Sequence, residues 1–380
     1  MSVRIFHTAD IHIGKKFSTF DVVPDLKSEL VERRFEVLGD MVDMANEHSC
    51  QLFVIAGDLF DTHTFNKGEH VEKVRSKLIG FEGDHILILP GNHDYCSEKN
   101  MNSWEWVEDI DRVSVLKETR PYELSIGDEK VIIYPGPCNS KISKDNKIDW
   151  IKDVEKDDPE AFKVGVAHGH LEGCSYDSQG SYYPMSKDDL EQCGMDVWLL
   201  GHVHVQIPEQ DTSLQDHLYP GTPEQEGFKR TAEGSEKGKA WIIELGERMS
   251  AESIDTGKYT FIHEERTLNS SEDLDELKKY LESDGNEHTL AKLEIKGRLE
   301  QDDHRDALEY INSLRHDHKG FRYIIVEDDD LDQRIDMELV KENFSEGSFP
   351  YTMLESLIEE EDEISKKAAE LGYDIFQEVD

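Results

Sequence analysis

The chain has 380 residues, of which 37% are hydrophobic and 9% aromatic, so we expect two or three domains with packed cores. No apolar run approaches the roughly 18 residues of a membrane span, and residues 1–7 lack the features of a signal peptide, which argues against a membrane or secreted protein. With 84 Asp and Glu against 42 Lys and Arg, the net charge is −42, which repels nucleic acid at low salt and by itself argues against DNA binding.

Strand and helix patterns alternate along the first 90 residues. Short apolar runs predict buried strands at 3–9, 52–56 and 85–89. Apolar residues at helical spacing predict helices over 28–47 and 68–79. This alternation predicts an α/β architecture with a largely parallel central sheet.

After residue 120 the sequence is typical of strands joined by turns. Gly127-Asp128 separates two strand-like segments, which predicts a β-hairpin. The polar segment 141–159 is expected to be a loop, and the apolar runs beyond it predict further buried strands. The strands expected in this region are 122–126, 130–134, 162–167, 196–200 and 239–245. The last of these closes the first domain, which we place at residues 1–257.

A second domain of the β-α-β-α-β type is expected over residues 258–349. Its strands are predicted at 259–266, 288–295 and 321–326, and its helices at 271–281 and 305–314. The remaining residues, 350–380, predict one acidic amphipathic helix. Its apolar points are Leu354, Leu357, Ile358, Ile364, Ala368 and Leu371. Either this helix packs on its own chain or it binds a partner protein.

Polar side chains that can bind metal follow five of the predicted strands. In an α/β sheet the ends of parallel strands meet at the edge where ligands bind. The DxH group at residues 10–12 and the HxH group at residues 202–204 each place two side chains on one face of an extended segment. Glycine precedes three of the groups and permits sharp turns there. The candidate site residues are Asp10, His12, Asp58, Asn92, His93, His168, His202 and His204.

This mixture of carboxylates, imidazoles and one amide oxygen suits divalent Mn, Fe or Zn better than a soft thiolate site would. Two such ions need one bridging carboxylate with further ligands on either side. Together they can generate a hydroxide that attacks a phosphodiester, without a covalent nucleophile. A single DxH or HxH is weak evidence, because it is often a surface pair. The conjunction of DxH, GD, GNHD, His and GHxH in this order predicts a two-metal phosphoesterase.

Six segments carry a resemblance to a known family, in the order HTADIHIGKKF, AGDLFDTHTF, LPGNHDY, VAHGHLEG, LLGHVH and LYPGTPEQEGF. With them the chain resembles the calcineurin-like metallophosphoesterase superfamily, and within it the SbcD-type nuclease subunit of a DNA double-strand-break repair complex. The resemblance covers residues 1–245 well and the remainder only in general layout. It implies a metallophosphoesterase-type α/β sandwich with a small α+β C-terminal capping domain.

The resemblance also implies two divalent metal ions, with Mn²⁺ as the expected metal, and it assigns their ligands. The first ion would be held by Asp10, His12, Asp58 and His204. The second ion would be held by Asp58, Asn92, His168 and His202, with Asp58 bridging. His93 would act as the general acid or charge stabiliser near the leaving oxygen.

For function, the resemblance implies a DNA exonuclease and endonuclease that works with an SbcC-like coiled-coil ATPase, as a homodimer within the complex. The domain at 258–349 would shape DNA access, and the tail at 350–380 would lie where such proteins contact the ATPase. No membrane association is expected. The expected location is the cytoplasm, because five scattered cysteines without a CxxC motif predict free thiols in a reducing compartment.

Some of these assignments have rivals. His170 competes with His168 as a ligand, although only His168 directly follows a predicted strand. Related repair nucleases place a histidine where this chain has Asp61, so His63 is a candidate for a second catalytic histidine. A nucleotide or protein phosphatase of the same superfamily is the main functional rival, although the Arg of the motif GDxxDRG is missing. A non-catalytic scaffold with the same fold is the second rival.

The acidic charge conflicts with a DNA-binding role unless salt screens it. In a halophile's cytoplasm the screening length falls to about 3 Å at 1 M salt, and acidic surfaces are common there. The other interpretation is a simply acidic protein with one local metal-bearing cleft. Both interpretations leave the predicted two-metal site in place.

Overall fold

The computed structural model describes residues 2–20, 23–63, 68–99, 101–107, 110–156, 158–174, 180–209, 216–228, 237–360 and 362–379. The chain divides into two compact units: Met1–Gly227 with Glu236–Thr260, and Phe228–Ser235 with Phe261–Asp380. All five cysteines are free thiols, as predicted. Within the described residues, every helix is too short or too polar to cross a bilayer.

The first unit contains two mixed sheets rather than one. The larger sheet has the spatial order β11 (Ser250–Asp255), β10 (Lys239–Leu245), β1 (Val3–Thr8), β2 (Leu52–Ala56), β3 (His85–Leu89) and β4 (Val113–Val115). Strands β1 to β4 run parallel, whereas β10 is antiparallel to both β1 and β11. We expected β10 to be the last strand of the first domain. The structure has one further strand after it, β11.

The second sheet of this unit has the spatial order β5 (Tyr122–Ile126), β6 (Glu129–Gly136), β7 (Phe162–His168), β8 (Val197–Gly201) and β9 (His217–Leu218). Strands β5 and β6 form the predicted antiparallel hairpin, and β6 to β9 run parallel. The parallel strands are divided between two sheets, so the expectation of one central sheet is wrong, whereas the expected α/β sandwich is confirmed.

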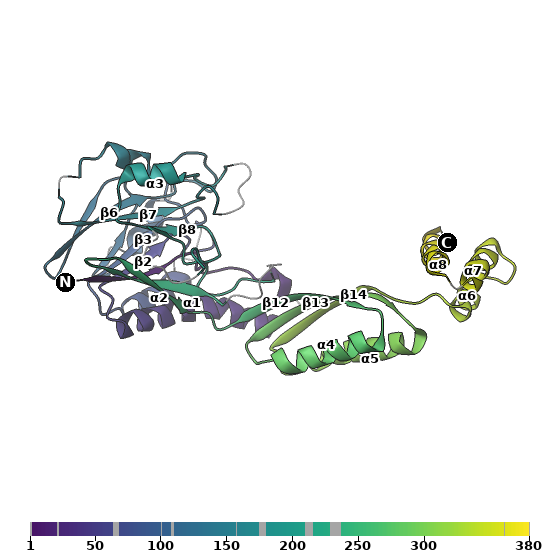
Figure 1. Ribbon diagram of the computed structural model, residues 1–380. Helices are drawn as coiled ribbons and strands as arrows, with labels where there is room; N and C mark the ends of the chain where they lie inside the picture. Colours follow the sequence, from purple (N-terminus) through teal and green to yellow (C-terminus); the bar gives the residue numbers. More distant parts are fainter. Residues whose placement is uncertain are drawn as a thin grey trace. The chain divides into compact units, whose positions relative to one another are not determined.

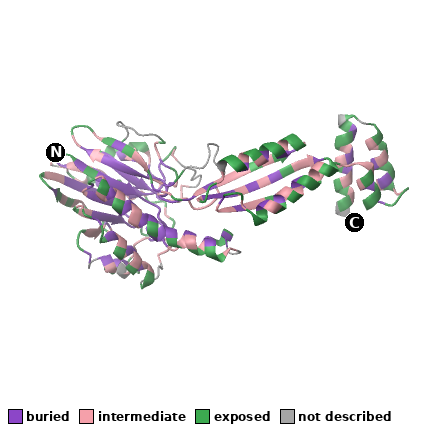
Figure 2. Ribbon diagram, turned by 90° about the horizontal axis from the view of Figure 1, so that it is seen from below, coloured by how far each residue is buried: buried purple, intermediate pink, exposed green. Residues whose placement is uncertain are grey.

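The two sheets share one apolar core. Side chains alternate along a strand, so Val3 and Ile5 of β1 lie on the face that packs against the second sheet. Val164 and Val166 of β7 belong to the same buried cluster. Figure 2 shows these strands buried along most of their length. The sandwich therefore holds the ends of its strands in fixed positions.

Helices cover the outer faces of both sheets (Figure 1). Phe6 and Phe53 lie on the outer face of the larger sheet, where their rings stack at 5.0 Å under two helices. Trp198 lies on the outer face of the other sheet. The covering elements are α1 (Pro24–Glu47) and α2 (Glu69–Leu78) on one side, and α3 (Lys187–Cys193) and the 3₁₀ segment η3 (Asp149–Asp153) on the other. The remaining 3₁₀ segments are η1 (Ser18–Phe20) and η2 (Met101–Val107).

The second unit contains the predicted β-α-β-α-β order. Its elements are β12 (Thr260–Leu268), α4 (Ser271–Asp284), β13 (Thr289–Leu299), α5 (Gln301–His316) and β14 (Tyr323–Gln333). Strand β13 is central and pairs in parallel with β14. Both helices cover one face of this sheet (Figure 1), where Leu277 and Ile311 are buried together with Leu293.

Three helices follow β14: α6 (Met337–Asn343), α7 (Phe349–Glu359) and α8 (Glu363–Val379). The prediction of a single C-terminal helix is therefore wrong. The carboxylate of Asp362 accepts hydrogen bonds from the first backbone N–H groups of α8 and so caps a new helix. Leu354 is fully buried in the small core of these helices, whereas Ile364 and Leu371 are 80% and 63% exposed.

Candidate metal centre

The eight predicted site residues lie at the carboxyl ends of strands from both sheets of the first unit. Asp10 and His12 follow β1, Asp58 follows β2, Asn92 and His93 follow β3, His168 ends β7, and His202 and His204 follow β8. Within the described residues, three groups of side chains bring possible ligand atoms within 4.8 Å of one another. These groups are Asp10-His12-His204, Asp10-Asp58-His168 and His12-Asp61-His93.

Four of these residues have left-handed backbone conformations, so the extended backbone expected for the DxH and HxH groups is wrong at Asp10, His12 and His202. The φ angles are 55° at Asp10, 51° at His12, 53° at Asp58 and 95° at His202. Such angles cost non-glycine residues about 1–3 kcal/mol each and persist only where surrounding contacts enforce them. Here the N–H of Asp10 donates to the carbonyl of Gly57 at 3.1 Å, and the N–H of His12 donates to the carbonyl of Asp58 at 3.0 Å. These bonds join the loop after β1 to the loop after β2.

The glycines before the ligand groups are needed chiefly because other groups pass close by. Gly57 has a φ of 96°, and a Cβ there would lie 2.1 Å from Nδ1 of His168. A Cβ at Gly91 would lie 2.2 Å from Oδ1 of Asp58. The predicted role in sharp turning therefore fits Gly57 but is wrong for Gly91 and Gly201, which do not have positive φ angles.

Asp58 lies between the two predicted ligand sets. Its Oδ1 accepts a hydrogen bond from the backbone N–H of His93 at 2.8 Å. Its Oδ2 lies 3.3 Å from Nε2 of His168 and 3.8 Å from Nε2 of His12. One oxygen is thus held by the backbone while the other faces a histidine of each set. This is the arrangement that a bridging carboxylate requires.

The residues predicted for the first ion converge around Nε2 atoms. Nε2 of His12 lies 3.4 Å from Nε2 of His204, and Oδ1 of Asp10 lies 3.8 Å and 3.5 Å from these two atoms. The other oxygen of Asp10, Oδ2, accepts a hydrogen bond from the N–H of His202 at 2.9 Å. Oδ1 of Asp10 is buried without a hydrogen-bond partner. A bound cation would satisfy this orphaned oxygen.

The residues predicted for the second ion surround the side-chain oxygen of Asn92. Nε2 of His168 lies 2.9 Å from this oxygen, and Nδ1 of His202 lies 3.1 Å from it. Nδ1 of His168 donates to the carbonyl of Ala56 at 2.9 Å, which directs Nε2 into the site. His202 therefore presents Nδ1 to the second set, whereas the other histidines present Nε2.

Burial and nearby carboxylates act in opposition on the four histidines of these sets. Burial lowers the pKa of His12 and of His202 to about 4. Burial opposes protonation of His168 and His204 as well, but neighbouring carboxylates outweigh it and raise the pKa to about 9 and about 10. Two imidazoles therefore carry protons that offset the buried carboxylates when no metal is bound. Carboxylate, imidazole and amide donors at this density fit divalent cations well.

His93 is fixed by its own backbone and by a neighbouring carbonyl. Its Nδ1 donates to the backbone carbonyl of Asp61 at 2.9 Å, and its ring lies edge-on to that of His12 with centroids 4.8 Å apart. The side chain is 33% exposed, which leaves it more accessible than most of the ligand side chains. His93 is thus placed beside the first set with Nε2 left for substrate.

Two carboxylates at this site were missed as site residues by sequence reasoning. Oε2 of Glu226 lies 2.9 Å from Nδ1 of His204, and Oδ1 of Asp61 lies 3.5 Å from Nδ1 of His12. Burial opposes ionisation of Glu226, but its hydrogen bond with His204 and nearby positive charges hold its pKa well below the ordinary value. Glu226 falls within the segment LYPGTPEQEGF, but nothing in its spacing predicts a contact with a histidine 22 residues away.

The two rival histidines are placed differently. The groups of possible metal ligands found among the described residues contain His168 and not His170. The ring of His63 stacks on that of Tyr95 with centroids 4.7 Å apart. Neither histidine belongs to a ligand group in the described part of the chain, so the structure favours His168 for the role that sequence left open.

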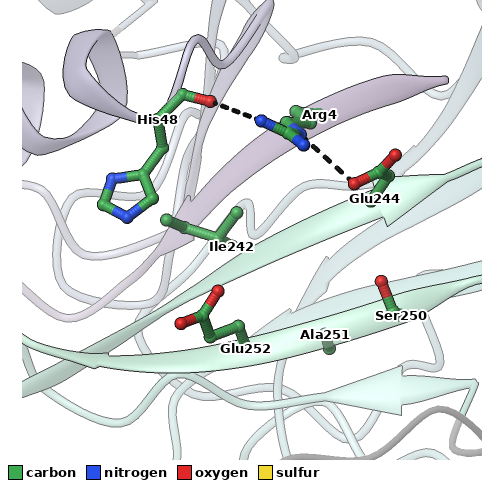
Figure 3. Close-up of a pocket in the computed structure, with 7 residues that line it drawn as sticks. All are labelled: Arg4, His48, Ile242, Glu244, Ser250, Ala251 and Glu252. Carbon is green, nitrogen blue, oxygen red and sulfur yellow. Dashed lines mark hydrogen bonds and ion pairs between the residues drawn. The ribbon is translucent and has the colours of Figure 1, made fainter.

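A separate pocket of about 180 Å³ lies over β1, β10 and β11 of the larger sheet (Figure 3). Arg4 lines this pocket. Its guanidinium donates hydrogen bonds to Glu244 and to the carbonyl of His48, both at 3.2 Å. The other lining residues are Ile242, Ser250, Ala251 and Glu252. The pocket shares no residue with the ligand sets, and two of its lining side chains are acidic, so it adds nothing to the metal centre.

The calcineurin-like phosphoesterase family matches residues 3–206. These residues make up more than half of the chain, and the protein belongs to this family. Its fold is the α/β metallophosphoesterase fold, and its histidine and aspartate residues form the dimetal site typical of the family. The fold and the candidate metal centre are therefore those of a metal-dependent phosphoesterase family.

Individual relatives are distant. The chain is 26% identical over 239 residues to the uncharacterized metallophosphoesterase YhaO of Bacillus subtilis, with 61% of this chain and 55% of that protein covered. It is 26% identical over 238 residues to the DNA double-strand break repair protein Mre11 of Methanopyrus kandleri, covering 58% and 49%. It is 30% identical over 104 residues to a subunit of the nuclease SbcCD of Escherichia coli, covering 26% and 23%. The chain thus spans about half the length of YhaO and of this Mre11, and less of the SbcCD protein.

Solved structures are similar over about two thirds of the chain. A dimetal phosphatase from Danio rerio has a TM-score of 0.39 and 11% identity, covering 66% of this chain and 98% of that one. A 5′-nucleotidase precursor from Thermus thermophilus has a TM-score of 0.35 and 13% identity, covering 67% and 54%.

Proposed function

We propose that this phosphoesterase is a DNA phosphodiesterase, an exonuclease and endonuclease that acts in double-strand-break repair. The observation that carries the proposal is the position of Asp58 between two ligand sets, because such a site can hydrolyse a phosphodiester without a covalent nucleophile. DNA as the substrate is supported by the similarity to Mre11 and to the SbcCD protein, whose names state DNA repair and nuclease functions.

In this proposal the site residues have two roles: the two ligand sets hold the metal ions, and His93 transfers a proton. Divalent cations held by the two ligand sets would neutralise the phosphate and activate the attacking water. The carbonyl of Asp61 accepts a hydrogen bond from Nδ1–H of His93, which leaves Nε2 as the ring nitrogen that can exchange a proton with the leaving oxygen. Asp10 and Asp58 each bond a backbone N–H through one oxygen, which orients the other oxygen before substrate binds.

We further propose that the C-terminal helices bind a coiled-coil ATPase and that residues 258–349 act as the capping domain of a homodimeric complex. The resemblance to SbcD-type proteins is the first support. The second is the exposure of large apolar side chains on α7 and α8, where Phe349 is 74%, Ile364 80% and Leu371 63% exposed. Exposed apolar side chains at such density are typical of protein interaction sites.

The test is a nuclease assay with Mn²⁺ on plasmid DNA and on end-labelled single-stranded and double-stranded oligonucleotides over a range of salt concentrations. Metal-dependent cleavage that disappears in Asp58→Ala would support the proposal. The rival is a phosphoesterase for nucleotides or phosphoproteins, and the net charge of −42 favours it because such a surface repels DNA at low salt. Hydrolysis of phosphomonoesters without DNA cleavage at any salt concentration would favour this rival.

A further inference from the structure

Glu226 contacts the outer nitrogen of His204, a predicted ligand of the first ion. The distance from Oε2 of Glu226 to Nδ1 of His204 is 2.9 Å. An ionised carboxylate only accepts hydrogen bonds, so Nδ1 of His204 carries a proton and Nε2 is the nitrogen left for metal. That Nε2 lies 3.5 Å from Oδ1 of Asp10 and 3.4 Å from Nε2 of His12, at the centre of the first ligand set.

Buried and half-buried cations hold Glu226 in place. Its side chain is only 6% exposed, Nζ of Lys15 lies 3.2 Å from Oε2, and the guanidinium of Arg34 lies 3.7 Å from Oε1. Arg34 is itself fully buried and donates to the carbonyl of Ile11 at 3.2 Å. Oε1 of Glu226 has no hydrogen-bond partner and lies 4.0 Å from Nε2 of His12. The carboxylate is therefore directed at the first set by contacts on both sides.

In the second ligand set, the outer nitrogen of His168 contacts a neutral group, whereas in the first set the outer nitrogen of His204 contacts the carboxylate of Glu226. Nδ1 of His168 bonds the carbonyl of Ala56 at 2.9 Å. A carboxylate on the outer nitrogen fixes the ring and makes the ligating nitrogen more basic, and its charge attracts the cation directly. Asp61 adds a second carboxylate 3.5 Å from Nδ1 of His12, again beside the first set.

We propose that Glu226 is a positioning residue of the first metal site, where it orients His204 and raises the affinity for a divalent cation above that of the second site. The first site then fills at a lower metal concentration than the second. This inference rests on the dimetal site of the family and not on DNA as substrate. Failure of the nuclease assay would therefore leave it untouched.

The test measures Mn²⁺ binding to the metal-free 380-residue chain. Binding is monitored by calorimetry and by electron paramagnetic resonance. Wild-type protein should show two unequal binding constants. Glu226→Gln keeps the size of the side chain and removes its charge, and loss of such an outer partner typically costs about 10–100-fold in metal affinity. We expect the tighter constant to weaken by that factor and the weaker constant to stay unchanged.

Glu224→Gln is the matched control. Glu224 lies two residues away, and its side chain is 3% exposed against 6% for Glu226, but its carboxylate bonds Arg33 at 2.6 Å and the backbone N–H groups of Lys258 and Tyr259. Both metal constants should survive this change. In an Asn92→Ala background, which removes an oxygen predicted for the second ion, the remaining tight binding should still respond to Glu226→Gln.

Three results would overturn the proposal: an unchanged tight constant in Glu226→Gln, an equal loss at both sites, or a loss confined to the weaker site. If circular dichroism shows that Glu226→Gln does not fold, the contact between Glu226 and His204 is tested in the wild-type protein instead. Zn²⁺-loaded protein with ¹⁵N-labelled histidine should show an exchange-protected Nδ1–H for His204, assigned through its proximity to the Glu226 methylene protons. Absence of this signal would falsify the proposed contact.

Discussion

The backbone N–H of His93 donates a hydrogen bond to Oδ1 of Asp58 at 2.8 Å. This bond joins the loop after β2 to the loop after β3 and turns Oδ2 of Asp58 toward both ligand sets. It also holds the backbone of His93 while the ring remains partly accessible. The two residues are thus linked, but their expected roles differ, because Asp58 holds metal and His93 holds a proton.

Replacing Asp58 by Ala should abolish phosphoesterase activity and remove both ions while the fold is retained. The physical reason is that one oxygen serves both ligand sets. The N–H of His93 loses its acceptor, which costs about 1–3 kcal/mol of stability. Metal analysis, activity and thermal melting measure the three effects, with the exposed Asp128→Ala as control. Near-wild-type turnover with both metals bound would rule out a bridging role.

Replacing His93 by Ala should leave both ions in place and slow turnover by about 10²–10⁴-fold, the typical contribution of a positioned proton donor. The reason is that the ring of His93 contacts the carbonyl of Asp61 and the edge of His12 but is not a member of either predicted ligand set. Metal content and kcat are measured on the same preparation. A metal content that falls as steeply as kcat would make His93 a ligand instead.

Metal binding should release protons at pH 7. Without metal, neighbouring carboxylates raise the pKa of His168 to about 9 and of His204 to about 10, although burial opposes this, so both imidazoles are protonated at neutral pH. Each must lose a proton to ligate a cation, so about two protons should be released at pH 7, and the number released should fall as pH rises through 9 and 10. Apparent affinity therefore rises with pH across this range.

Calorimetric titration in buffers of different ionisation enthalpy measures this release. The ion pairs that protonated His168 and His204 form with neighbouring carboxylates also stabilise the metal-free fold. This stabilisation is fully present below pH 6.5, the ordinary pKa of histidine, and is lost as pH rises through 9 to 10. Binding heats that are the same in every buffer at pH 7 would contradict the protonated state of these two histidines.

DNA cleavage, if the proposed function is correct, should have an optimum well above physiological ionic strength. Phosphate contacts weaken as salt rises, but the net charge of −42 creates a general repulsion that salt screens. The second effect is expected to dominate at low salt. Initial rates from low to molar salt on one oligonucleotide measure the balance. A rate that falls steadily from the lowest salt concentration would remove the halophilic interpretation while leaving the nuclease proposal intact.

Exposed and buried residues of the C-terminal helices should respond differently to substitution. Ile364→Ser with Leu371→Ser changes exposed side chains, so it should leave the melting temperature unchanged and abolish co-purification with the ATPase. Leu354→Ala, at a fully buried position, should instead destabilise the three-helix core by about 2–5 kcal/mol. Co-expression pull-down and thermal melting measure both outcomes. An exposed-residue variant that melts earlier yet still binds the ATPase would show that these residues serve folding alone.

Several strands were predictable to the residue because their signals are local. Strands β2, β3 and β10 begin and end at the predicted residues. Strand β11 was missed because its signal is not local, and helix α3 was missed because it is short. The segment of β11 is largely polar and is a strand because it pairs with β10, and α3 has only seven residues and begins at a capping box formed by Ser186 and Asp189.

The sequence by itself predicted that the eight candidate site residues gather at one edge, since each motif directly follows or ends an apolar strand and parallel strands present such positions at one edge. Only the tertiary structure decided that those strands belong to two sheets, that Oδ2 of Asp58 faces both ligand sets, and that Glu226 stands behind His204. The signals of the buried strands lie in neighbouring residues of the chain. The pairing of side chains from distant segments depends on how the sheets pack and on left-handed backbone that surrounding bonds enforce, and no local pattern encodes either.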